Sequence, residues 1–147
     1  MTKGVMIFAH NNEGIDYVKL ACATALMIRK NMNVDGITLV TDDTSLNYSL
    51  TDHESIAKYF FDEIVQYDSQ KFTKKTYRDH IKTNKVLTFY NGDRCQAWDI
   101  TNYDETIVID SDYLIQSNIL NNCWGSEDSF MANKHITTIN TLFPMQQ

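Results

Sequence analysis

Two carboxylates one residue apart, Asp110 and Asp112, are the side chains of this sequence whose types and spacing best suit chemistry. They follow residues 106–109, a β-branched run that predicts a buried strand. Open α/β sheets present ligand sites at the carboxyl ends of their strands. Two hard oxygen ligands there favour Mn²⁺ or Mg²⁺ shared with a phosphate. The alternative is a solvated strand end whose carboxylates only cap the next helix.

The elements needed to position this pair begin at the amino terminus. Residues 5–9 form a compact apolar run, residues 15–30 have the spacing of an amphipathic helix, and residues 37–41 form a second β-branched run. Strand, helix and strand at this spacing predict a βαβ unit with parallel strands and a right-handed crossover. The sequence therefore predicts an α/β fold with a mainly parallel sheet.

Polar residues follow both strands of this unit, where α/β folds bind nucleotides. His10 and Asn11 follow the first strand, although His10 is equally well explained as a turn residue without a role. Asp42 follows the second, either to hydrogen-bond a ribose hydroxyl or to cap the next turn. Neither G-x-G-x-x-G nor G-x-x-x-x-G-K-[ST] occurs, so a dinucleotide fingerprint and a P-loop are both excluded.

The middle of the chain predicts further elements of the same kind. Residues 53–60 predict a short helix and residues 63–67 a third strand, whereas residues 68–78 are polar and basic and predict an exposed loop. Residues 81–90 return to helical spacing and carry Lys85, which either neutralises a diphosphate or only keeps a helix surface soluble.

Composition narrows the classes of protein. The 147 residues fit one domain, residues 1–147, and the net charge of −6 argues against a nucleic-acid-binding surface. No apolar run approaches the roughly 20 residues that a membrane span needs. The cysteines form no C-x-x-C pair, which indicates reduced thiols and, with no signal-peptide pattern, a cytoplasmic protein.

A resemblance to a known family appears in the block of residues 103–115, which Lys85-Val86-Leu87 precedes at a short distance. This block resembles the centre of nucleotide-sugar glycosyltransferases with the GT-A fold, in particular the glycogenin and lipopolysaccharide-galactosyltransferase type. Residues 7–12, with Tyr17 in the next helix, resemble the uridine-binding start of that family. The resemblance implies a Rossmann-like three-layer sandwich.

The resemblance also implies a donor site and a reaction. Asp110 and Asp112 would hold Mn²⁺ (or Mg²⁺) bridging the diphosphate of a nucleotide-diphosphate sugar, with a UDP-sugar favoured, while an unknown acceptor hydroxyl attacks the anomeric carbon. Ser111 would lie against the ribose, and Lys85 would approach the sugar or the diphosphate. Ala9, His10, Asn11 and Tyr17 would frame the base. Asp42, from its position after the second strand, is a further candidate for binding the donor.

One departure from the family pattern leaves other functions open. Family members continue beyond the D-x-D into an acceptor-binding half that supplies a histidine ligand, whereas here His135 alone follows the pair, much closer to it. We therefore expect the third ligand and the acceptor site to be missing, or completed by a partner subunit or a homo-oligomer. The alternatives are a non-catalytic nucleotide-binding or assembly protein and, less favoured, a haloacid-dehalogenase-like phosphatase.

Overall fold

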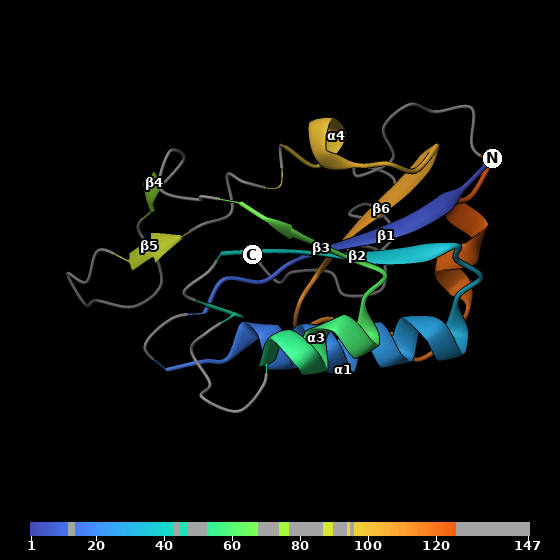
Figure 1. Cartoon of the computed structure of the whole chain (residues 1–147). Helices are drawn as coiled ribbons and strands as arrows, with labels where there is room; N and C mark the ends of the chain where they lie inside the picture. The colour runs from blue at the N-terminus through green and yellow to red at the C-terminus, as the bar shows by residue number, and fades with distance from the viewer. Residues whose placement is uncertain are drawn as a thin grey trace, which may run out of the picture.

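Four parallel strands form the central sheet, in the order β3-β2-β1-β6 (Figure 1). The computed structural model describes residues 1–11, 14–42, 45–46, 53–67, 74–76, 87–89, 94 and 96–125. The strands of the sheet are β1 (Lys3–Phe8), β2 (Gly36–Thr41), β3 (Glu63–Gln66) and β6 (Glu105–Asp110). The predicted α/β class, the parallel βαβ unit and the strand before the carboxylate pair are confirmed.

The strand β1 lies at the centre of this arrangement. Phe8, its last residue, pairs with Val40 of β2 on one side and with Asp110 of β6 on the other. Because β2 and β6 both run parallel to β1, the loops that follow all three strands leave from the same edge of the sheet.

Two helices cover one face of the sheet (Figure 1). They are α1 (Tyr17–Asn31) and α3 (His53–Phe60), both at the positions that the sequence predicts. Asp16 caps α1 by accepting a hydrogen bond from the Lys19 N–H at 3.0 Å. None of the helices in the described part of the chain has the length and apolar character that crossing a bilayer requires.

Alternate residues of the strands face opposite sides of the sheet. Val5 and Ile7 of β1 join the core beneath α1, whereas Met6 and Phe8 pack on the other face. Each of these apolar side chains is at most 5% exposed, and full burial of such a side chain stabilises the fold by about 1.5–3 kcal/mol.

The second face carries α4 (Ala97–Ile100), a short helix that the sequence did not reveal (Figure 1). Ala97 packs with Met6 and Phe8 there. In β6, Ile107 and Ile109 belong to the core on the α1 side. By the alternation of a strand, the Asp110 side chain therefore leaves β6 on the α4 side.

Tyr103 packs on the α4 face, across the starts of β1 and β2. A Cβ added to Gly4 would overlap Cγ and Cδ2 of the Tyr103 ring, and one added to Gly36 would meet the Tyr103 hydroxyl. Gly4 and Gly36 are direct register partners. Two paired glycines thus make the shallow seat in which this ring lies.

Replacing Gly4 with alanine should destabilise the protein by about 1–3 kcal/mol, the usual effect of overpacking a filled interior. In a Tyr103→Ala background the same replacement should cost much less, because the overlapping ring is gone. Urea denaturation of the four members of this double-mutant cycle measures the coupling. Additive effects of the two mutations would show that the Tyr103 ring does not limit the space at Gly4.

Two sequence predictions fail in the middle of the chain. The strands β4 (Lys74–Thr76) and β5 (Leu87–Phe89) pair antiparallel as a separate ribbon. The prediction of a loop through residues 74–76 and of a helix through residues 87–89 is therefore wrong. Short apolar runs do not distinguish helix from strand by periodicity, and aromatic and β-branched residues favour the strand.

Candidate functional site

The direction in which successive strands are added to the sheet reverses between β1 and β6. The chain proceeds from β1 outward to β2 and β3, and β6 then pairs on the opposite side of β1. In open α/β sheets, the crevice outside the carboxyl ends of strands at such a switch point is where ligands bind. The segments that meet there contain six predicted site residues, namely Ala9, His10 and Asn11 after β1, and Asp110, Ser111 and Asp112 at the end of β6.

The carboxylate pair lies on a tight turn. The Tyr113 N–H donates to the Asp110 carbonyl at 3.1 Å, which closes a β-turn over four residues. Asp112 is exposed in this turn, whereas Ser111 is only 5% exposed. The turn therefore presents Asp112 to solvent, and the predicted contact of Ser111 with a ribose stays a prediction.

A buried hydroxyl on α1 holds this turn from the α1 face. Thr24, which is 2% exposed, donates from Oγ1 to the Ser111 carbonyl at 2.8 Å and to the Tyr113 carbonyl at 3.2 Å. About two turns further along the helix, the Asn31 side chain donates from Nδ2 to the Ile115 carbonyl at 2.7 Å. These contacts fix the segment after β6 against α1.

An arginine contacts the pair from the other face of the sheet. Arg94, which precedes α4, forms an ion pair with Asp110 through Nη2 and Oδ1. Asp110 Oδ1 is shielded from solvent, although the side chain as a whole is 45% exposed. One oxygen of the predicted metal ligand is therefore held by a cation of the protein itself.

Asn11 connects the loops after β1 and β2. Its backbone N–H donates to Ser45 Oγ at 2.7 Å, and its Nδ2 donates to the Ser45 carbonyl at 3.3 Å and to Asp16 Oδ1 at 3.1 Å. Its Oδ1 accepts from the Val18 N–H at 3.0 Å. The amide is thus occupied in holding the loop to α1, and a role in framing a base would be one of positioning.

Ala9 and Asp42 follow β1 and β2 at the same edge of the sheet, and hydrogen bonds fix both residues. The Ala9 N–H donates to the Val40 carbonyl at 2.9 Å, and the Ala9 carbonyl accepts from Thr41 Oγ1 at 2.5 Å. Asp42 Oδ1 accepts from the Ser45 N–H at 2.6 Å. Of the two roles weighed for Asp42, the capping role is present; contact with a ribose stays a prediction.

The amino terminus of α1 supplies no ready anion site. Phosphates commonly bind at such a terminus through its unpaired N–H groups and its partial positive charge. Here the Asn11 amide and the Asp16 carboxylate accept from the N–H groups of Val18 and Lys19, and Asp16 adds negative charge. A diphosphate at this edge would therefore need positive charge from a metal or a basic side chain.

The donor set fits a divalent metal that arrives with phosphate. Asp110 and Asp112 offer carboxylate oxygens, which Mg²⁺ and Mn²⁺ prefer. Within the described ranges, no group of three or more His, Cys, Asp or Glu side chains comes together. Mg²⁺ commonly binds through one or two carboxylates together with substrate phosphates, so two carboxylates suffice for a metal shared with a ligand.

Three predicted site residues remain, namely His10, Tyr17 and Lys85. His10 is half-buried directly after Ala9, and Tyr17 is the first residue of α1, partly buried against the core. Lys85 lies outside the described residues, so its predicted contact stays a prediction.

Thiol chemistry finds no support at the described cysteines. Burial, with a smaller effect from the nearby Asp16 charge, raises the pKa of the Cys22 thiol to about 11. Burial also raises the pKa of Cys123. Because the thiolate is the reactive form, both side chains behave as small apolar residues at neutral pH.

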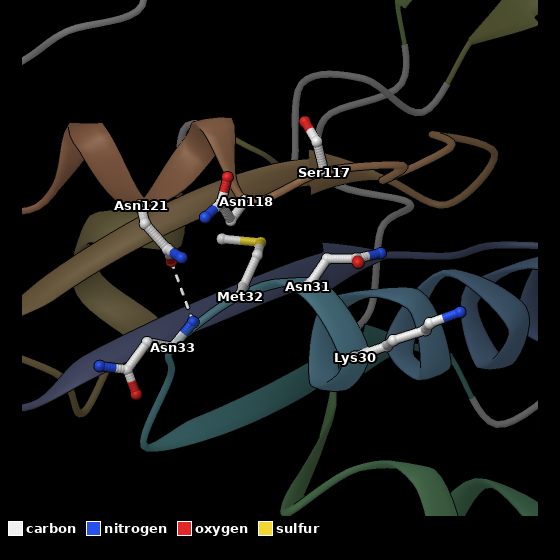
Figure 2. Close-up of a pocket in the computed structure, with 7 residues that line it drawn as sticks. All are labelled: Lys30, Asn31, Met32, Asn33, Ser117, Asn118 and Asn121. Atoms are coloured by element: carbon white, nitrogen blue, oxygen red, sulfur yellow. Dashed lines mark hydrogen bonds between the residues drawn. The ribbon is translucent and has the colours of Figure 1, made fainter.

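An open groove of about 520 Å³ lies at the other end of α1, lined by Lys30, Asn31, Met32, Asn33, Ser117, Asn118 and Asn121 (Figure 2). Its polar side chains partly hold the chain together, since Asn121 Oδ1 accepts from the Asn33 N–H at 2.9 Å. Because α1 runs back along the sheet, this groove is remote from the carboxylate pair.

Sequence reasoning missed three residues that shape the site, namely Thr24, Ser45 and Arg94. Thr24 carries one weak signal, a hydroxyl residue between two alanines, whereas Ser45 lies in a polar stretch and carries none. The sequence carries no comparable signal for Arg94, because only the packing of α4 brings it to Asp110. Comparison of the chain with protein-family models, with curated proteins and with solved structures finds no match.

Proposed function

We propose that the protein binds a nucleotide-diphosphate sugar where β1 and β6 end and transfers the sugar to a hydroxyl acceptor in a metal-dependent reaction. The observation that carries this proposal is the Asp110–Asp112 turn at the switch point of a parallel sheet. The strand order agrees with half of a doubly wound, Rossmann-like sheet, as a GT-A-type sandwich requires.

The chain's own residues would bind and orient the donor. Asp110 and Asp112 would hold Mn²⁺ or Mg²⁺, which supplies Lewis-acid stabilisation of the departing diphosphate. Thr24 keeps the turn in place through the carbonyls of Ser111 and Tyr113. The loop after β1, fixed by Asn11, would face the base of a UDP-sugar.

A second candidate is a non-catalytic nucleotide-binding or assembly protein. The end of the turn and the segment after it expose three large apolar side chains, with Tyr113 44%, Leu114 66% and Ile119 64% exposed. Neighbouring exposed apolar residues such as Tyr113 and Leu114 favour an interaction surface. A second copy of the chain or a partner subunit could cover them.

Calorimetry with UDP, GDP and their sugars, with and without Mn²⁺, tests the donor site. We expect UDP to bind only with the metal, and the Asp110→Ala/Asp112→Ala double variant to lose that binding. A protein that binds none of these nucleotides under either condition would contradict the proposal.

A donor-hydrolysis assay then separates the two candidates. With UDP-sugar and Mn²⁺, a transferase should release UDP slowly even without its acceptor, because water can replace the acceptor hydroxyl. Binding without release of UDP, together with self-association that a Leu114→Ser variant abolishes, would favour the assembly protein.

A further inference from the structure

Arg94 and Asp110 form an ion pair between the predicted metal ligands and α4. The Arg94 side chain is 36% exposed and that of Asp110 is 45% exposed, so the pair lies at the protein surface and not in the core. Arg94 reaches Asp110 because both face the α4 side of the sheet. An exposed pair of this kind adds little to stability, which leaves its presence at the site to be explained.

Arg94 supplies positive charge at an edge of the sheet where the amino terminus of α1 does not. The amino terminus of α1 is already capped by Asp16 and Asn11, so the protein does not offer its dipole to a phosphate. A guanidinium carries five N–H donors in a planar fork that matches phosphate oxygens. Arg94 is thus a basic group already at the edge where a diphosphate would lie.

The same pair conflicts with metal binding. Asp110 Oδ1 is shielded from solvent in the pair, so this oxygen cannot face a metal while Arg94 remains in place. Asp112, in contrast, is exposed. A diphosphate that draws Arg94 away would free Asp110 and provide the guanidinium with an anionic partner at the same time.

We propose that Arg94 is a diphosphate-binding residue that occupies Asp110 in the ligand-free protein and transfers to the diphosphate when metal and ligand bind together. This inference rests on the proposed function only for the nucleoside that the diphosphate carries. The binding of the diphosphate itself is argued from Arg94 and Asp110. It makes binding of metal and diphosphate cooperative: metal alone must compete with Arg94, whereas metal with diphosphate need not.

Arg94→Met removes the charge and keeps much of the length of the side chain. We expect this variant to bind Mn²⁺ alone about threefold more tightly, the size of effect expected for an exposed ion pair. With saturating Mn²⁺, it should bind inorganic pyrophosphate and UDP about tenfold more weakly, as expected when a hydrogen bond to a charged group is lost. Calorimetry measures both, and Arg94→Gln serves as the second variant if Arg94→Met does not fold.

Arg29→Met is the matched control. Arg29 pairs with Asp62 at 2.8 Å, with side-chain exposures of 41% and 45%, close to those of the proposed pair. It lies in the last turn of α1, away from the crevice, so both affinities should stay at the wild-type values.

Three results would overturn the inference: unchanged pyrophosphate affinity in Arg94→Met, tighter pyrophosphate binding, or weaker binding of Mn²⁺ alone. The proposed function fails separately. If the wild type binds pyrophosphate with Mn²⁺ but no nucleotide, and Arg94→Met shows the expected changes, then the role of Arg94 stands without the nucleotide-sugar function. A wild-type protein that binds neither Mn²⁺ nor pyrophosphate would overturn both.

Discussion

Replacing Asp112 with asparagine is expected to weaken Mn²⁺-dependent UDP binding by about 100-fold, because losing one partner of a close charge interaction costs about 2–5 kcal/mol. The fold should be unaffected. Asp112 is exposed, and the turn that carries it is closed by the backbone bond from Tyr113 to Asp110 and by Thr24. Surface substitutions of this kind usually change the free energy of unfolding by less than about 0.5 kcal/mol.

Asp104→Asn is the control for the change in net charge. Asp104 precedes β6 at the opposite edge of the sheet, and its Oδ2 accepts from the Thr2 N–H at 2.7 Å. This bond lowers the pKa of Asp104 below its usual value, so the control also removes a full negative charge at neutral pH. Its metal-dependent UDP affinity should equal that of the wild type. Equal loss in both variants would indicate a general charge effect and no specific site at Asp112.

The position of the carboxylate pair at the end of a parallel strand was predictable because it depends on local patterns. Residues 5–9, 37–41 and 106–109 are short β-branched or apolar runs, and such runs form the buried strands of parallel sheets whose two faces are both covered by helices. Once these strands are parallel, the residues that follow them meet at one edge. The carboxylate pair and His10 could therefore be placed together from the sequence.

The contacts that support the site could not be predicted. The bond from Thr24 to Ser111 joins residues 87 positions apart, and the bond from Asn11 to Ser45 joins residues 34 apart. A threonine within a helix more often bonds to its own helix or faces solvent, so its type alone does not announce a distant partner. Strand order decides which partner it meets.

The prediction for β4 and β5 was wrong for a different reason. Residues 81–90 contain apolar residues at spacings that suit a helix, yet Leu87–Phe89 pairs as a strand. A three-residue strand is shorter than one helical period, so periodicity carries no information about it. Pairing with Lys74–Thr76 decided the outcome, and that partner is visible only in three dimensions.

Replacing Thr24 with valine is expected to weaken ligand binding without removing any residue that contacts the ligand. Valine keeps the shape of threonine but leaves the carbonyls of Ser111 and Tyr113 without the buried donor, and an unsatisfied buried acceptor costs about 1–3 kcal/mol. Metal-dependent UDP affinity should fall about tenfold, because the turn no longer holds the Asp110 and Asp112 carboxylates in the positions that metal binding needs. Amide hydrogen exchange at Tyr113 should accelerate, since the bond from Tyr113 to Asp110 closes the turn that Thr24 holds.

Two variants separate this positioning role from a loss of stability. Thr38 is also buried, and its hydroxyl bonds to Glu63 Oε2 at 3.2 Å on β3. Thr38→Val should therefore destabilise the protein while it leaves both UDP affinity and exchange at Tyr113 unchanged. Thr24→Ser keeps the hydroxyl and should restore both. If Thr24→Val and Thr38→Val lower affinity equally, then Thr24 contributes to stability alone, and the turn keeps its geometry without it.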